Sequence, residues 1–121
     1  MDKQPNILLV DDEERILNFI KIKLKASGYG VATANNGQEG LSLVESQKPD
    51  LILLDILMPI MDGFEMLKRL RAFSTVPVIV ISAHTSTMGK ALELGANDCI
   101  MKPFSPDELL NRIRNLLNHK K

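Results

Sequence analysis

The fold is decided by the stretch Leu51-Ile-Leu-Leu-Asp-Ile-Leu-Met-Pro-Ile-Met-Asp-Gly63. Its first four residues are all apolar, as in strands that are buried on both faces of a parallel sheet. Asp55 closes this strand. A second apolar run, Ile7–Val10, closes on the adjacent acids Asp11 and Asp12. Because parallel strands end at the same edge of such a sheet, we expect the three carboxylates to meet there.

These three carboxylates predict a metal site. Like charges gathered at one edge cost stability unless a cation lies among them. A hard cation such as Mg²⁺ (or Mn²⁺), bound by carboxylates, waters and a phosphoryl group, would neutralise them. One of Asp11 and Asp12 is also expected to cap the first helix, but a cap accounts for one acid and not for two. Asp55 lies too far upstream to cap the helix that begins near Asp62, so Asp62 is the expected cap there.

Strands and helices alternate along the rest of the chain. Val78–Ile81 is another continuous apolar strand, Gly30–Ala34 alternates as a strand nearer an edge does, and Cys99–Met101 is short. An eight-fold barrel needs about twice this length, so an α/β fold with an open, doubly wound parallel sheet is predicted. Its helices are predicted from apolar spacing and a capping box: Ile16, Phe19, Ile20 and Leu24 in the first, and Ser105-Pro-Asp-Glu108 at the start of the last.

The composition describes an ordinary single domain. Residues 1–121 are enough for one core and too few for two. Fifteen basic and fifteen acidic residues cancel, so this domain is not itself expected to bind nucleic acid. The single cysteine, Cys99, suits a reducing cytoplasm, and no apolar stretch reaches the length of a membrane span. Residues 119–121 are expected to form a loose tail.

Two further polar residues follow strands at the acidic edge. Ser82 comes directly after Val78–Ile81, and Lys102 follows the short fifth strand. Alone, such a serine is more often a turn residue and such a lysine a solvated one. Acids, a hydroxyl and a lysine together on four strand ends are much less probable by chance than any one of them alone. Lys102-Pro103 is in addition a candidate cis peptide.

These motifs, taken in order, resemble the signature of response regulator receiver domains from two-component signalling. The resemblance rests on Asp11-Asp12, on Asp55 through Gly63, on Ser82-Ala83 and on Lys102-Pro-Phe104, and it extends over essentially the whole chain. It implies a flavodoxin-like sheet with strand order 2-1-3-4-5 and five flanking helices. It also implies a signalling switch that is not an enzyme beyond its own phosphoryl transfer and dephosphorylation.

The same resemblance assigns roles to individual residues. Asp55 would accept a phosphoryl group from the phosphohistidine of a histidine kinase. Asp12 would bind Mg²⁺ directly, Asp11 mainly through water, and the carbonyl of Leu57 would complete the protein ligands. The remaining two residues would act on the phosphoryl group itself, Ser82 by a hydrogen bond and Lys102 by an ion pair.

Three features depart from the family pattern. Cys99 stands three residues before Lys102, where the family usually has an aromatic side chain that turns inward on switching. The segment from Ser82 to Lys102 is about two residues shorter than usual, which predicts an irregular fourth helix. His84 would lie beside the phosphoryl site and could tune the lifetime of the phosphate, or be an inert loop residue.

The end of the chain most resembles receivers that precede a winged-helix DNA-binding domain, which would make this a transcription regulator. Such receivers pair through the fourth helix, fifth strand and fifth helix. Asp98, Glu108 and Arg112 match charged positions of that face, and Met88 replaces a basic one. A homodimer with an Asp98–Arg112 pair across it is one interpretation, and a solvated charged face explains the same residues equally well.

Three other functions share part of this pattern. A phosphohydrolase of the haloacid-dehalogenase type would have a second aspartate two residues after Asp55, where this chain has Leu57. A flavin-binding module would need a Ser/Thr/Gly-rich loop after the first strand, where this chain has four acids. A pseudo-receiver that is never phosphorylated is disfavoured by the complete set of site residues.

Overall fold

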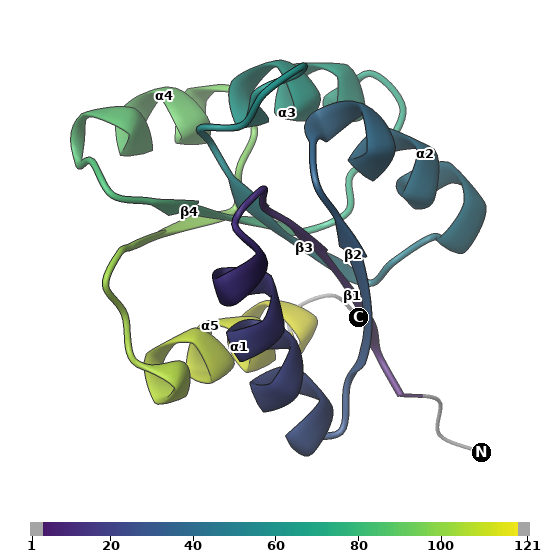
Figure 1. Cartoon of the computed structure of the whole chain (residues 1–121). Helices are drawn as coiled ribbons and strands as arrows, with labels where there is room; N and C mark the ends of the chain where they lie inside the picture. Colours follow the sequence, from purple (N-terminus) through teal and green to yellow (C-terminus); the bar gives the residue numbers. More distant parts are fainter. Residues whose placement is uncertain (1–3, 119–121) are drawn as a thin grey trace.

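The computed structural model describes residues 4–118, so the predicted tail lies outside the described residues. Five parallel strands form one sheet, with α1 and α5 on one face and α2, α3 and α4 on the other (Figure 1). Within residues 4–118, no helix is both long and apolar enough to cross a membrane. The elements are β1 (Asn6–Val10), α1 (Glu14–Ala26), β2 (Gly30–Ala34), α2 (Gly37–Gln47), β3 (Leu51–Asp55), α3 (Gly63–Arg71), β4 (Val78–Ser82), α4 (Ser86–Glu93), β5 (Asp98–Met101) and α5 (Pro106–Asn118).

The strand order is β2-β1-β3-β4-β5, so the predicted fold and order are confirmed. The register aligns the ends of the strands. Val10 pairs with Leu54, which places Asp11 and Asp55 at the same level just beyond that pair. Ser82 pairs with Met101, so Lys102 follows immediately at the end of β5. The sheet therefore delivers all of its strand-end polar residues to one edge.

The sheet divides the core into two apolar layers. In the first helix, one of the apolar residues whose spacing predicted the helix is not buried. Leu17, Ile20 and Leu24 are the buried residues of α1, whereas Phe19 is 49% exposed. Leu17, Ile20 and Leu24 are spaced by three and four residues and share one face, and Phe19 falls beside that face. Its ring lies 5.7 Å from the ammonium of Lys23 instead.

Two predicted helix caps are confirmed and one is wrong. Asp62 Oδ1 accepts the N–H of Glu65 at 2.9 Å, and Ser105 Oγ accepts the N–H of Glu108 at 3.0 Å. The predicted cap of α1 by Asp11 or Asp12 is not formed, because the helix begins only at Glu14 and its N-cap residue makes no side-chain hydrogen bond. The Lys102–Pro103 peptide is cis, as predicted.

Gly63 allows α3 to start directly against the end of β3. Its N–H donates to the carbonyl of Ile56 at 2.8 Å. A Cβ at this position would lie 2.4 Å from the carbonyl oxygen of Asp55 and 2.8 Å from Cα of Ile56. These are backbone atoms, which cannot rotate away as a side chain can. The glycine at the end of the deciding stretch therefore fixes the backbone that carries Asp55.

We expect Gly63→Ala to lower the free energy of unfolding by about 1–3 kcal/mol, because the added methyl group overpacks the end of β3. The measurement is chemical denaturation of both proteins. Gly89→Ala is the matched control, since a Cβ there meets nothing within 4 Å and alanine favours the helix by about 0.8 kcal/mol. Equal stability of Gly63→Ala and the wild type would contradict this account of the turn.

Candidate functional site

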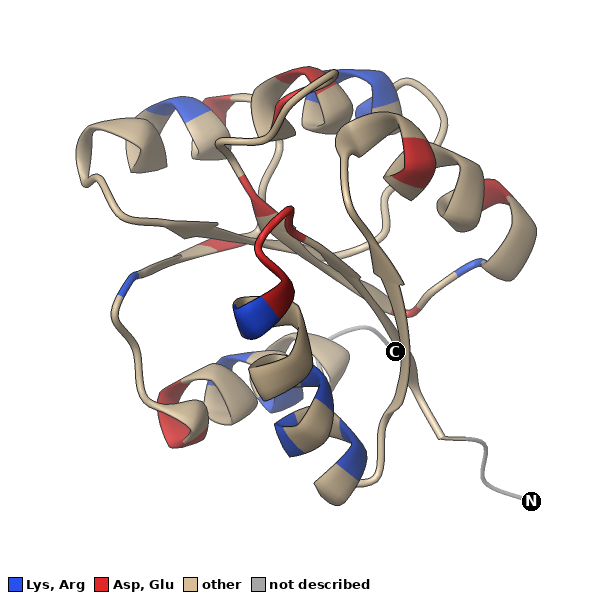
Figure 2. Cartoon of the chain, in the orientation of Figure 1, with Lys and Arg blue, Asp and Glu red and all other residues tan. Residues whose placement is uncertain are grey.

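The three strand-end carboxylates come together. Asp11, Asp12 and Asp55 each offer one oxygen, and these oxygens all lie within 4.8 Å of one another. Figure 2 shows the acidic loop after β1 lying against the acidic end of β3. Their exposure differs: Asp11 is fully buried and Asp55 is 6% exposed, whereas Asp12 is open to solvent. The cluster therefore has a buried floor and an open side from which an ion or a phosphate donor can approach.

The donor set fits a hard divalent cation. Among the described residues, the one buried side-chain polar atom without a hydrogen-bond partner is Asp11 Oδ2. The other oxygen of Asp11 accepts the N–H of Glu13 at 3.0 Å. Oxygen ligands of an octahedral Mg²⁺ lie about 3 Å apart when adjacent and about 4.2 Å apart when opposite, so the three carboxylate oxygens would draw closer together to share an ion. An orphaned carboxylate oxygen in a cluster of acids is what a cation would satisfy.

Lys102 supplies the positive charge of the site. Its Nζ lies 3.4 Å from Asp55 Oδ1, 3.6 Å from Glu13 Oε1 and 3.8 Å from Asp11 Oδ2. Burial lowers the pKa of Lys102, but the carboxylates of Asp55 and Asp11 outweigh burial and leave this pKa above its ordinary value. The ammonium is therefore charged at neutral pH, and it lies within 4 Å of three carboxylates.

Ionisation of Asp55 is costly in this site. Burial raises its pKa, the neighbouring charge of Asp11 adds to the rise, and Lys102 opposes it, so the pKa of Asp55 is about 6. Burial also raises the pKa of Asp11. The lysine alone therefore does not balance the acids, which leaves the site with a demand for additional positive charge.

Ser82 lies at the same edge but its hydroxyl is engaged with the loop that follows. Ser82 is 3% exposed, and its Oγ accepts the N–H of His84 at 3.1 Å. It also lies 2.5 Å from Oγ1 of Thr87, in the first turn of α4. The side chain of His84 is exposed. Ser82 is thus within the site in position, while its hydrogen bonds lead to α4.

The predicted dimer-face residues contact one another within the chain. Arg112 Nη1 donates to Asp98 Oδ1 at 2.8 Å and to the carbonyl of Cys99 at 2.7 Å, and Nη2 donates to Glu108 Oε2 at 3.3 Å. A dimer that used an Asp98–Arg112 pair would have to exchange this internal pair for an intermolecular one. The dimer face stays a prediction.

Cys99 lies in β5 opposite Val80, half-buried against the layer of α2, α3 and α4. Burial, aided by the charge of Asp98, raises the pKa of its thiol. Its Sγ lies 3.7 Å from the carbonyl of Met88. The position that usually holds an aromatic ring is thus filled by a small thiol against the first half of α4.

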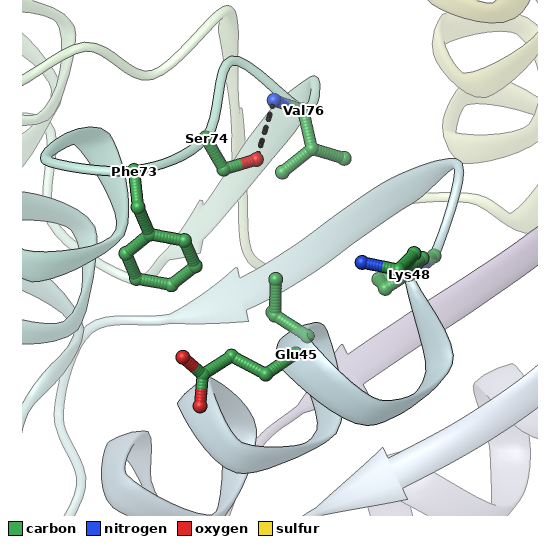
Figure 3. Close-up of a pocket in the computed structure, with 7 residues that line it drawn as sticks. Glu45, Lys48, Phe73, Ser74 and Val76 are labelled. Carbon is green, nitrogen blue, oxygen red and sulfur yellow. Dashed lines mark hydrogen bonds between the residues drawn. The ribbon is translucent and has the colours of Figure 1, made fainter.

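A cleft of about 540 Å³ lies elsewhere, at the opposite edge of the sheet (Figure 3). It opens between the end of α2 and the loop before β4, next to the amino ends of β3 and β4. The acidic site lies at the carboxyl ends of the strands, where ligands of doubly wound sheets bind. This cleft lies at their amino ends and is therefore separate from the acidic site. Its lining residues are Val44, Glu45, Lys48, Pro49, Phe73, Ser74 and Val76.

Comparison with known proteins identifies the family. The response regulator receiver domain family matches residues 7–114. The chain is a response regulator receiver domain. Receiver domains are signalling switches that partner with histidine kinases, and Mg²⁺ and phosphorylation are general features of the family.

Named relatives include transcription regulators. The chain is 44% identical over 114 residues to the alkaline phosphatase synthesis transcriptional regulatory protein PhoP of Bacillus subtilis, covering 92% of this chain and 48% of that protein. It is 41% identical over 110 residues to the DNA-binding response regulator MtrA of Mycolicibacterium paratuberculosis, covering 89% and 49%. The chain thus spans about half the length of the curated relatives it matches.

Solved structures agree on the fold. The receiver domain of Francisella response regulator 1452 superposes with a TM-score of 0.92 at 37% identity, covering 98% of this chain and all of that one. A CheY-like receiver domain protein from Methanospirillum hungatei superposes with a TM-score of 0.91 at 32% identity, covering 97% and 96%.

Two residues of the site were missed by the sequence prediction of roles. Glu13 was grouped with the acids but given no role, and it forms an ion pair with Lys102. Thr87 lies in the segment 84–88, which is rich in Ser and Thr, and its hydroxyl contacts Ser82. The repeated hydroxyls after β4 were the available signal, but no spacing rule indicates which of them turns back to the sheet.

We expect Asp55→Asn to stabilise the protein at pH 7.5 without divalent cations, by up to about 3 kcal/mol. Because the pKa of Asp55 rises from 3.8 to about 6 on folding, the wild type loses this stability as the pH rises through that window. Well below the ordinary pKa of 3.8, at about pH 2.5, Asp55 is neutral in both the folded and the unfolded state, and the difference between the two proteins should vanish. Chemical denaturation at several pH values measures this, with the exposed Glu45→Gln as control. A destabilised Asp55→Asn at pH 7.5 would refute the account of the charge cluster.

Proposed function

We propose that this receiver domain is a switch phosphorylated on Asp55 by a histidine kinase. The observation that carries the proposal is the meeting of Asp55, Asp11, Asp12 and Lys102 at one edge of the sheet, with three carboxylate oxygens within 4.8 Å of one another and the ammonium 3.4 Å from Asp55. Residues 1–121 are proposed to form one receiver domain that acts in the cytoplasm.

The proposed transfer needs little from the protein beyond position and charge. A carboxylate oxygen of Asp55 attacks the phosphorus of phosphohistidine, the P–N bond breaks, and the imidazole keeps the electron pair and takes a proton from solvent. Lys102 stabilises the charge of the phosphoryl oxygens by an ion pair, and Ser82 donates a hydrogen bond to one of them. Attack of water on the phosphorus later releases inorganic phosphate and restores the carboxylate. The exposed His84 is proposed to tune this last step.

Mg²⁺ or Mn²⁺ is the proposed cofactor. Asp12, the exposed acid of the cluster, would bind it directly and the buried Asp11 mainly through water, with Asp55 and the Leu57 carbonyl as further ligands. When bound, the ion would neutralise the carboxylates and the phosphoryl oxygens during transfer. The orphaned Oδ2 of Asp11 supports this assignment.

The output of the switch is proposed to be control of transcription, since the relatives named above are transcription regulators. Asp98, Glu108 and Arg112 are proposed to form the face through which two receivers pair. A phosphohydrolase is a weaker candidate, since its general acid would occupy the position of Leu57, an apolar side chain that is 67% exposed.

We expect incubation with acetyl phosphate and Mg²⁺ to add one phosphoryl group, in an acid-stable and hydroxylamine-labile linkage, as acyl phosphates are. Mass spectrometry before and after hydroxylamine measures it. Asp55→Asn should abolish the mass gain. Asp62→Asn is the matched control, because asparagine can keep the helix cap and Asp55 is retained. Labelling that persists in Asp55→Asn would exclude this residue as the acceptor.

We expect Mg²⁺ to raise the melting temperature of the wild type, because a ligand of the folded state adds about 2.7 kcal/mol at a hundredfold excess over its Kd. Asp12→Ala should reduce this shift because a direct ligand is lost. Asp107→Ala, which removes an exposed acid from the start of α5, should retain it. If all three proteins show the same shift, the ion does not bind at Asp12.

A further inference from the structure

The hydroxyl groups of Ser82 and Thr87 join the last residue of β4 to the first turn of α4. Their oxygens are 2.5 Å apart, and the backbone of His84 lies between them, bonded to both: its N–H donates to Ser82 Oγ at 3.1 Å, and its carbonyl accepts from Thr87 Oγ1 at 2.8 Å. The three groups form a closed ring of hydrogen bonds.

Counting protons gives this ring a direction. Each hydroxyl has one proton to donate. The arrangement with the shorter bonds has Thr87 donating to the carbonyl of His84 at 2.8 Å and Ser82 donating to Thr87 at 2.5 Å. The alternative acceptor for Ser82 is the same carbonyl at 3.2 Å, a longer bond. The single proton of Ser82 is therefore donated to Thr87 in α4 and not to Asp55.

We propose that Thr87 is a positioning residue that holds the Ser82 hydroxyl on α4 until Asp55 is phosphorylated. This inference rests on the proposed function. A phosphoryl oxygen carries negative charge and is a stronger acceptor than a neutral hydroxyl. Ser82 then exchanges Thr87 for that oxygen, while Thr87 keeps its bond to the carbonyl of His84.

The exchange loosens a helix that has few other attachments at its start. Within α4 the buried residue is Ala91, in the second half of the helix, and the N-cap Thr85 makes no side-chain hydrogen bond. Beyond the ring of Ser82, His84 and Thr87, the side-chain hydrogen bond to the first half of α4 among the described residues is from Cys99 Sγ to the Met88 carbonyl at 3.7 Å, and a thiol is a weak donor. Loss of the Ser82–Thr87 bond therefore frees the first turn of α4 from the sheet.

The test is Thr87→Val, which keeps the shape of the side chain and removes the hydroxyl. The probe is beryllofluoride with Mg²⁺, a non-hydrolysable stand-in for the phosphoryl group, with Kd measured by calorimetry. We expect binding about two- to tenfold tighter than in the wild type, the range produced by one hydrogen bond that no longer has to break. Thr87→Ser keeps a hydroxyl and should bind as the wild type does.

Two controls separate this role from a structural one. Thr85→Val makes the same chemical change two residues earlier, at a side chain without a cap bond, and should leave Kd unchanged. In a Ser82→Ala background, Thr87→Val should have no effect, because the bond is already absent.

Three results would overturn the inference. They are an unchanged or weaker Kd in Thr87→Val, an equal gain in Thr85→Val, and a gain that survives Ser82→Ala. A wild type that binds no beryllofluoride and is not labelled on Asp55 would instead overturn the proposed function, and this inference with it.

Discussion

Repulsion among buried carboxylates is the constraint on which the rest of this structure depends. Asp11 and Asp55 are almost without solvent, and burial raises the pKa of both. Lys102 approaches each of them but is a single charge against a cluster. Such a site destabilises the protein by itself and favours any state in which a cation is bound among the carboxylates. The buried carboxylates that destabilise the fold therefore also make it respond to added positive charge.

The apolar core on both faces of the sheet offsets the repulsion among these carboxylates. The three central strands, with their continuous apolar runs Ile7–Val10, Leu51–Leu54 and Val78–Ile81, supply most of the sheet's buried residues in the two core layers. The register of the strands brings each strand-end residue to a fixed level. Val10 opposite Leu54 sets the spacing of the acids, and Ser82 opposite Met101 sets that of the hydroxyl and the lysine. Backbone pairing therefore fixes the levels of Asp55 and Ser82 directly, and Asp11 and Lys102 each follow one residue after a paired position.

The fold and the charged part of the site could be predicted because both follow from local signals. Apolar runs ending in acids are visible in the sequence, and parallel pairing brings their ends together. What escaped prediction depends on side-chain direction within an element. Phe19 fits a helical spacing yet lies beside the buried face, and Thr87 is one of several hydroxyls in its segment. Helix α1 begins at Glu14, later than a cap by Asp11 or Asp12 predicted, because the chain after β1 first turns, with Asp11 accepting a hydrogen bond from the Glu13 amide.

In the proposed switch, phosphorylation of Asp55 would act most readily on the fourth helix, whose start has few attachments. Gly89 lies within it and would leave a Cβ in open space, so the helix carries the entropic cost of glycine without a packing reason. At its other end, Leu94 and Ala96 pack in the core, and the Arg71 guanidinium donates to the carbonyl of Gly95 at 3.0 Å. With that end held and the first turn tied mainly through hydroxyls, the proposed exchange at Ser82 would move the start of α4 more than its C-terminal end. Cys99 is too small to transmit such a movement as a rotating ring would, so the hydrogen bonds after β4 are the more direct route from the acidic site to the surface.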